Sequence, residues 1–113
     1  MTAAEFRRIA LSLPETAESS HMRHPDFRVA GKIFATLGYP EKGWGMVKLF
    51  PDQQAELVKS GHDTFVPVKG KWGQRGATSV RLKNAKPATL RKALRAAWLQ
   101  AAPKRLVAQP LED

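Results

Sequence analysis

The chain has 113 residues, with 42% hydrophobic and 26% charged side chains, a formal net charge of +9 and no cysteine. This size and composition indicate one folded domain over residues 1–113 and exclude disulfides, thiolate nucleophiles and cysteine-ligated zinc. No apolar run approaches the roughly 20 residues that cross a bilayer, and the first dozen residues do not form the apolar stretch of a signal peptide. We therefore expect a cytoplasmic protein without membrane contact, and a monomer rather than an oligomer.

The first half of the chain predicts one helix followed by three strands. Thr2 and Glu5 fit a capping box at the start of an amphipathic helix, which Pro14 ends. Residues 15–25 are polar and show no period, so we expect a loop there. From residue 26 the apolar period changes to two, which indicates strands. The strands are expected at residues 26–29, 32–37 and 44–49, with a tight turn at residues 30–31.

The middle of the chain predicts a surface helix and then a long hairpin, or wing. Pro51 stands at a first helical position and Gly61 follows the last one, while the apolar side of this helix is thin. The β-branched runs at residues 64–68 and 78–82 flank a glycine-rich turn, a pattern typical of a hairpin. Pro67 cannot donate to a strand ladder, so the first of these strands is expected at a sheet edge.

A C-terminal helix is the clearest element of the sequence. Apolar side chains follow the helical period over residues 90–101, and Pro103 comes directly after. The expected order is therefore α-β-β-β-α-β-β-α. This order predicts an α+β fold, a single compact domain with a mainly antiparallel sheet and helices at both ends.

The excess positive charge lies almost entirely in the second half of the chain. Residues 1–60 hold eight basic and seven acidic side chains, whereas residues 61–113 hold eleven basic and three acidic ones. No acidic residue occurs over residues 64–111. Charge confined to one region builds a positive face whose field collects polyanions, so nucleic acid is the leading partner.

The glycine-rich turn at residues 69–76 is the first candidate site. Its cations Lys69, Lys71 and Arg75 are predicted to contact phosphates, with glycines that let the backbone approach closely. Trp72 is a candidate for stacking on a base or a sugar. The alternative for Trp72, which we favour for this residue alone, is packing on the sheet as a core or rim aromatic.

Cations outside this turn form a second group. Arg81 and Lys83 alternate with apolar residues of a predicted strand, so they are expected on the face opposite the core. Arg91 and Arg95 lie one turn apart on the C-terminal helix. We expect them to contact nucleic acid, to meet acidic residues of the first half, or to form a solvated face. If about six phosphates are neutralised, log K falls with log salt at a slope near −5.

His21, His24 and Asp26 superficially resemble a metal or acid–base cluster. Two histidines without a third clear ligand make a poor zinc site, and we favour a histidine bonded to a loop carbonyl. A deep pocket beside these residues would support an enzyme, and a solvated loop would remove that idea. The chain has no Walker loop, Gly-x-Ser-x-Gly or His-Glu-x-x-His motif, so we predict a non-catalytic protein without cofactor or metal.

Several short stretches together resemble a known family. They are Leu13 to Glu15, His24 to Val29, Gly31 to Ala35, Val47 to Leu49, Phe65 to Pro67, Trp72-Gly-x-x-Gly76 with Thr78, and Ala97-Trp98 with Ala102 to Lys104. Over about residues 8–106 the chain is similar to the MmcQ/YjbR family. The resemblance implies a compact fold called a double-wing motif, close in shape to frataxin (CyaY)-like proteins. It also implies DNA binding, with no catalytic residues or cofactor.

We therefore predict a non-catalytic protein that binds nucleic acid, first of all duplex DNA, through its backbone. The predicted contacts are Lys69, Lys71, Trp72, Arg75, Arg81, Arg91 and Arg95. The alternative is a protein-interaction or small-anion-binding module, with no nucleic-acid partner, whose basic face meets an acidic protein surface.

Overall fold

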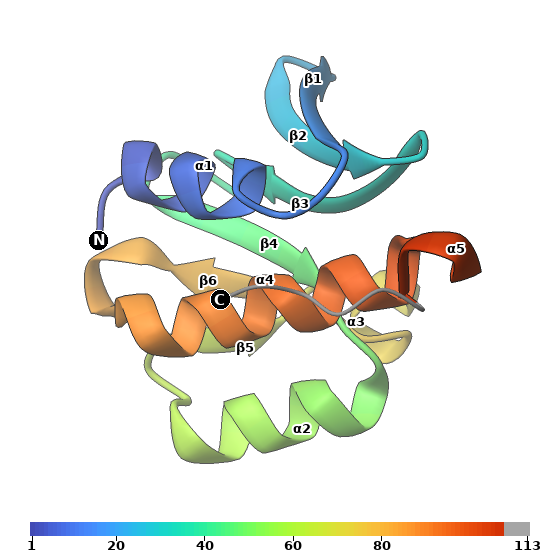
Figure 1. Cartoon of the computed structure of the whole chain (residues 1–113). Coiled ribbons are helices and arrows are strands. Elements are labelled where there is room, and N and C mark those ends of the chain that lie inside the picture. Colours follow the sequence, from blue (N-terminus) through green and yellow to red (C-terminus); the bar gives the residue numbers. More distant parts are fainter. Residues whose placement is uncertain (108–113) are drawn as a thin grey trace.

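A six-stranded antiparallel sheet forms the centre of the molecule (Figure 1). The computed structural model describes residues 1–107, so the expected domain of residues 1–113 is described up to Val107. The sheet has the strand order β1-β2-β3-β4-β6-β5. The strands are β1 (Thr16–His21), β2 (His24–Val29), β3 (Lys32–Leu37), β4 (Trp44–Lys48), β5 (Phe65–Pro67) and β6 (Ala77–Arg81).

The helices flank this sheet and confirm the predicted α+β class. They are α1 (Ala3–Leu11), α2 (Pro51–Ser60), α3 (Lys71–Gln74), α4 (Pro87–Ala101) and α5 (Lys104–Val107), with a 3-10 turn at Leu82–Asn84. Helices α1 and α4 pack against each other and against one face of the sheet (Figure 1). Helix α2 lies along the β5 side, and α3 sits inside the hairpin between β5 and β6. Within residues 1–107, no helix has the length and apolar character that crossing a membrane requires.

The core lies between the sheet and the pair α1 and α4. Phe6 of α1 and Trp98 of α4 are fully buried there. The Phe6 ring lies so close to Gly45 on β4 that a Cβ at this position would meet it at 2.9 Å. The Trp98 indole N–H donates to the Pro14 carbonyl at 3.0 Å, which ties the last long helix to the end of the first.

The opposite face of the sheet, called the open face below, positions the candidate site. Side chains alternate along a strand, so the neighbours of the core-facing Gly45 and Val47 on β4 point the other way. Met46 is one of these neighbours, and it pairs in register with Thr36 on β3 and with Ser79 on β6. These three side chains form a row across the centre of the open face.

Most helix boundaries match the sequence. The capping box of Thr2 and Glu5 is present, with the Glu5 amide donating to Thr2 Oγ1 at 3.1 Å. Helix α2 begins at Pro51 and buries only Gln54, which confirms a surface helix. Pro67 ends β5, the edge strand that the sequence predicted.

The predicted loop at residues 15–25 is wrong, because β1 occupies most of it. Strand β1 is the other edge of the sheet and pairs only with β2 among the described strands. Its side chains are almost all exposed. An edge strand with solvent on both faces has no apolar alternation, so the pattern that reveals a strand is missing. A two-residue turn joins it to β2, with Met22 and Arg23 both at positive φ (49° and 68°).

The second correction concerns the end of β6. The strand stops at Arg81, and Leu82–Asn84 forms the 3-10 turn instead of continuing it. Lys83 is therefore not a strand residue, and its predicted alternation with Arg81 is wrong. The glycine-rich turn is also not an open hairpin tip, because α3 forms inside it.

Candidate functional site

Residues 69–76, called the α3 turn below, are packed tightly onto the rest of the fold. A Cβ at Gly73 would overlap the carbonyl oxygen of Val68, and one at Gly76 would overlap that of Leu49. Gln54 Nε2 of α2 donates to the carbonyl of Gly73 at 2.9 Å and to that of Ala77 at 2.9 Å. These two glycines thus allow protein backbone, not a phosphate, to approach, which corrects the sequence interpretation.

Trp72 stands on the surface of this rigid turn. Its side chain is 60% exposed, so it is not a core residue. The ammonium of Lys48 on β4 lies 4.9 Å from the indole centroid, a cation–π contact that holds one part of the ring over the sheet. Burial lowers the pKa of Lys48. Trp72 is therefore a rim aromatic, within the alternative that the sequence favoured.

Four cations lie on the α3 turn or next to it. Lys69, Lys71 and Arg75 are exposed on the α3 turn, and Lys48 reaches it from β4. None of the four forms a salt bridge with an acidic side chain in residues 1–107. Carboxylates of the first half have other partners: Glu18 pairs with Arg7 at 2.8 Å, and Glu15 pairs with Arg105 at 3.0 Å.

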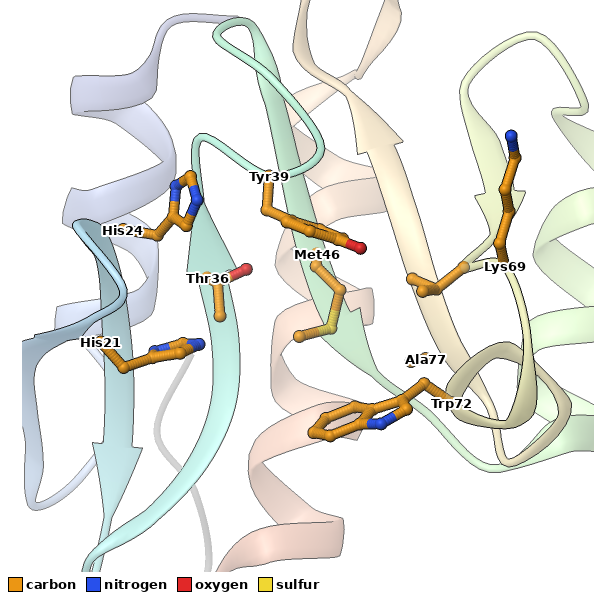
Figure 2. Close-up of a pocket in the computed structure, with 9 residues that line it drawn as sticks. His21, His24, Thr36, Tyr39, Met46, Lys69, Trp72 and Ala77 are labelled. Carbon is orange, nitrogen blue, oxygen red and sulfur yellow. The ribbon is translucent and has the colours of Figure 1, made fainter.

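The structure does not gather all seven predicted contacts at one place. Lys69, Lys71, Trp72 and Arg75 lie together on the α3 turn. Arg81 lies at the far end of β6, where its guanidinium stacks 4.5 Å above the Trp44 ring. The helix arginines, Arg91 and Arg95, belong to α4, which covers the sheet face away from Trp72 (Figures 1 and 2).

A pocket of about 220 Å³ opens on the open face beside the α3 turn. Figure 2 shows Tyr39 and Trp72 on opposite sides of it, with Met46 between them. His21 and Thr36 line a third side, and the Lys69 side chain extends along the side formed by the hairpin. The structure thus places His21 at the end of β1 beside a pocket and not in a solvated loop, so the observation that would have removed the enzyme alternative is not made.

A buried carboxylate holds His21 in this position. Asp26 has no exposed surface, and its Oδ2 lies 2.8 Å from His21 Nδ1. Arg28 donates to both oxygens of Asp26, at 2.8 and 3.0 Å. The Arg28 hydrogen bonds, and after them the one from His21, keep the pKa of Asp26 below its ordinary value. The expected bond from a histidine to a loop carbonyl is wrong for His21, because its partner is this carboxylate.

The geometry leaves the second ring nitrogen of His21 available. With Nδ1 held by Asp26, Nε2 is the nitrogen that reaches the pocket side of the ring (Figure 2). His24 packs edge-on against Tyr39, with ring centroids 5.9 Å apart. Residues 1–107 contain no group of three His, Cys, Asp or Glu side chains that could hold a metal ion.

Sequence reasoning missed Tyr39 and Lys48, and it left His21 without a role. Alternation on two paired strands was the signal for His21, since His21 and Asp26 fall on the same face once β1 is recognised as a strand. Nothing in the sequence near Tyr39 or Lys48 indicates that Tyr39 lines a pocket with Trp72 or that Lys48 contacts the Trp72 ring.

The family comparison agrees with the sequence motifs. The YjbR family model matches residues 11–100, which confirms the resemblance found in the sequence. The crystal structure of Deinococcus radiodurans protein DR2400, with a DUF419 domain, is similar with a TM-score of 0.76 and 18% identity, over 92% of this chain and 80% of that chain. At that identity the likeness shows the fold alone. No curated protein matches the chain.

Proposed function

The chain belongs to the YjbR family, and from that premise and the geometry of the α3 turn we propose that it is a nucleic-acid-binding protein. In this role it acts as a binding module and not as an enzyme. Lys69, Lys71 and Arg75 contact the phosphates, with Lys48 beside them, and Trp72 contacts a base or a sugar.

The observation that carries this function is an exposed tryptophan among cations that lack acidic partners. An aromatic ring that is 60% exposed keeps a large apolar surface in water, and such a surface in a positive setting suits the flat face of a base. Lys69, Lys71 and Arg75 have no salt bridge in the described part of the chain to lose when a phosphate arrives, whereas Lys48 already contacts the Trp72 ring. Phosphate contacts of this kind give affinity without reading a sequence.

The geometry favours an unpaired strand over the duplex that the sequence suggested. Helix α3 has four residues, too few to lie in a major groove and contact several base edges. A base can stack on Trp72 only where it has left its own stack. We therefore expect single-stranded nucleic acid to bind more tightly than duplex DNA of the same length.

Fluorescence anisotropy with a labelled oligothymidylate and a duplex, at several salt concentrations, tests this function. Four phosphates neutralised on a single strand give a slope of log K against log salt of about −3. The variant Lys69→Ala/Lys71→Ala/Arg75→Ala is expected to weaken binding and to bring the slope to about −1.

A charge-matched variant serves as the control. Lys86→Ala/Arg91→Ala/Lys92→Ala removes three cations at the start of α4, away from the α3 turn. We expect it to keep most of the affinity. Equal loss in both triple variants would mean that only total charge matters, and absence of binding to either polymer at low salt would overturn the proposed function.

A further inference from the structure

The pocket beside Trp72, called the slot below, is lined mostly by apolar and aromatic side chains. We infer that this pocket holds a single unstacked nucleobase whose phosphate is bound by Lys69. For a base that belongs to a nucleic-acid strand, this inference rests on the proposed function. Tyr39 and Trp72 form two opposite aromatic sides (Figure 2). The volume of the pocket is about 220 Å³.

A buried hydroxyl in the pocket lacks a partner. Thr36 is 3% exposed, and its Oγ1 makes no hydrogen bond with any residue in the described range 1–107. Buried polar atoms are almost always hydrogen-bonded, so an unsatisfied one at a pocket wall marks a place for a polar ligand atom. Figure 2 shows this oxygen pointing into the space between His21, Tyr39 and Met46.

A second polar group lines the same pocket as Thr36. His21 Nε2 reaches the pocket, and its ring orientation is set by the 2.8 Å contact between Nδ1 and the buried Asp26. Because Nδ1–H donates to the Asp26 carboxylate, Nε2 of the neutral His21 ring is an acceptor, whereas the Thr36 hydroxyl can donate or accept. They therefore match the edge of a base, which carries donors and acceptors next to each other.

The walls of the pocket are fixed before any ligand arrives. His21 is held by Asp26, Tyr39 is packed edge-on against His24 at 5.9 Å, and Trp72 is carried by the tightly packed α3 turn. Such preorganisation lowers the ordering cost of binding, so a small ligand can be held in a small site.

The chemistry of the lining excludes simpler ligands. A sugar needs many hydrogen-bonding partners, whereas Tyr39, Met46, Trp72 and Ala77 present mostly apolar surface. An inorganic anion would have to sit on that apolar floor, away from the exposed ammonium of Lys69. A base with its attached phosphate satisfies both parts, since the ring enters the slot and the phosphate stays at Lys69.

Strands with and without bases separate this inference from the proposed function. The probes are an oligothymidylate and an abasic strand of the same length and charge, together with free thymidine 5′-monophosphate and ribose 5-phosphate. One stacked base is worth about 5- to 150-fold in affinity, so we expect the abasic strand to bind at least about tenfold more weakly. We also expect the mononucleotide to bind at one saturable site where ribose 5-phosphate does not.

Two pocket variants make the assignment specific. Ala77→Leu fills the slot and leaves the cations of the α3 turn in place, and it should reduce affinity for the oligothymidylate to that for the abasic strand. Ala88→Leu, at an exposed position of α4, is the matched control and should have no effect.

Thr36→Val adds a test that does not depend on accommodating a larger side chain. It replaces the unsatisfied hydroxyl with a methyl group of the same shape, so the melting temperature of the free protein should stay equal or rise, while affinity for thymidine 5′-monophosphate falls by about 2- to 10-fold. Stability and binding moving in opposite directions would be unexpected for a residue with a merely structural role.

The outcomes of these experiments distinguish the base pocket from the nucleic-acid-binding function. Equal binding of oligothymidylate and abasic strands, unchanged by Ala77→Leu, would overturn the base pocket and leave the nucleic-acid function standing. Saturable binding of thymidine 5′-monophosphate without binding of any strand would support the pocket and overturn the strand-binding function. Failure of every probe to bind would overturn both.

Discussion

Replacing Asp26 with asparagine removes the buried charge that holds His21 and Arg28. Asp26 Oδ1 accepts from Arg28 Nε at 2.8 Å, and Oδ2 accepts a second Arg28 hydrogen bond at 3.0 Å and faces His21 Nδ1 at 2.8 Å. The amide of the Asp26→Asn variant keeps the shape and one acceptor oxygen but has a donor in place of the other oxygen. At least one Arg28 hydrogen bond is lost with the negative charge.

The magnitude follows from the burial of the three groups. Breaking a buried ion pair by removing one partner costs about 3–5 kcal/mol. Arg28 and His21 are 34% and 42% exposed, so water can hydrate them in the variant, and the expected loss is smaller, about 2–3 kcal/mol. With an unfolding entropy of about 2.1 cal/mol/K per residue, this loss lowers the Tm by about 8–13 °C.

The loss of stability in Asp26→Asn is expected to depend on pH. The folded pKa of Asp26 lies below its unfolded value of about 3.9, so its contribution is complete above about pH 4 and is lost as the pH falls through the folded pKa. Urea unfolding of both proteins should therefore show a constant difference in free energy from about pH 7 down to about pH 4, and a shrinking difference below it.

Glu18→Gln is the matched control for this substitution. The pair of Glu18 and Arg7 has the same chemistry at the surface, with both side chains about one third exposed, and such pairs contribute about 0–1 kcal/mol. A loss of stability for Asp26→Asn no larger than that for Glu18→Gln would refute the account of Asp26 as the residue that fixes this side of the pocket.

Four further substitutions test packing and backbone strain by thermal or urea unfolding. Gly76→Ala should destabilise the protein by more than about 3 kcal/mol, because a Cβ there overlaps the Leu49 carbonyl and the φ is 111°. Gly70→Ala, where the Cβ enters open space at a φ of 82°, should cost only about 1–2 kcal/mol. Similar losses of stability in the two variants would contradict the tight packing of the α3 turn. Arg23→Gly should stabilise the protein by about 0.5–1 kcal/mol, since glycine relieves a φ of 68° at a small cost in unfolded-state entropy, and a loss of stability would show that the turn is not strained. Trp98→Phe should cost about 2–3 kcal/mol through a lost hydrogen bond and a smaller ring, and a change under about 0.5 kcal/mol would contradict its place in the core.

The sequence predicts those elements whose apolar pattern faces one side only. Helices α1 and α4 each pack one face on the core, so their period is visible in the residues. Strand β1 escapes detection because an exposed edge strand buries nothing that would impose alternation. The end of β6 was misplaced for a related reason, since Leu82 is buried in a 3-10 turn as fully as it would be in a strand.

The cations and Trp72 of the candidate site are evident in the sequence, whereas the pocket is not. Its walls come from β1, from the loop after β3 and from the α3 turn, and only the pairing of distant strands brings them together. The glycines at positions 73 and 76 show the same limit. A glycine reveals that something approaches closely, but which backbone approaches it depends on the tertiary fold.

The indole N–H signals of the three tryptophans offer the most direct test of where nucleic acid binds. Each sits in a different place: Trp72 on the α3 turn, Trp44 under Arg81 at the other end of the open face, and Trp98 in the core. In a nitrogen–proton correlation spectrum titrated with an oligothymidylate, we predict that the Trp72 signal shifts progressively to saturation while the Trp44 and Trp98 signals stay in place. A shift of Trp44 with Trp72 unchanged would contradict the account and move the interface to the Arg81 end of the sheet.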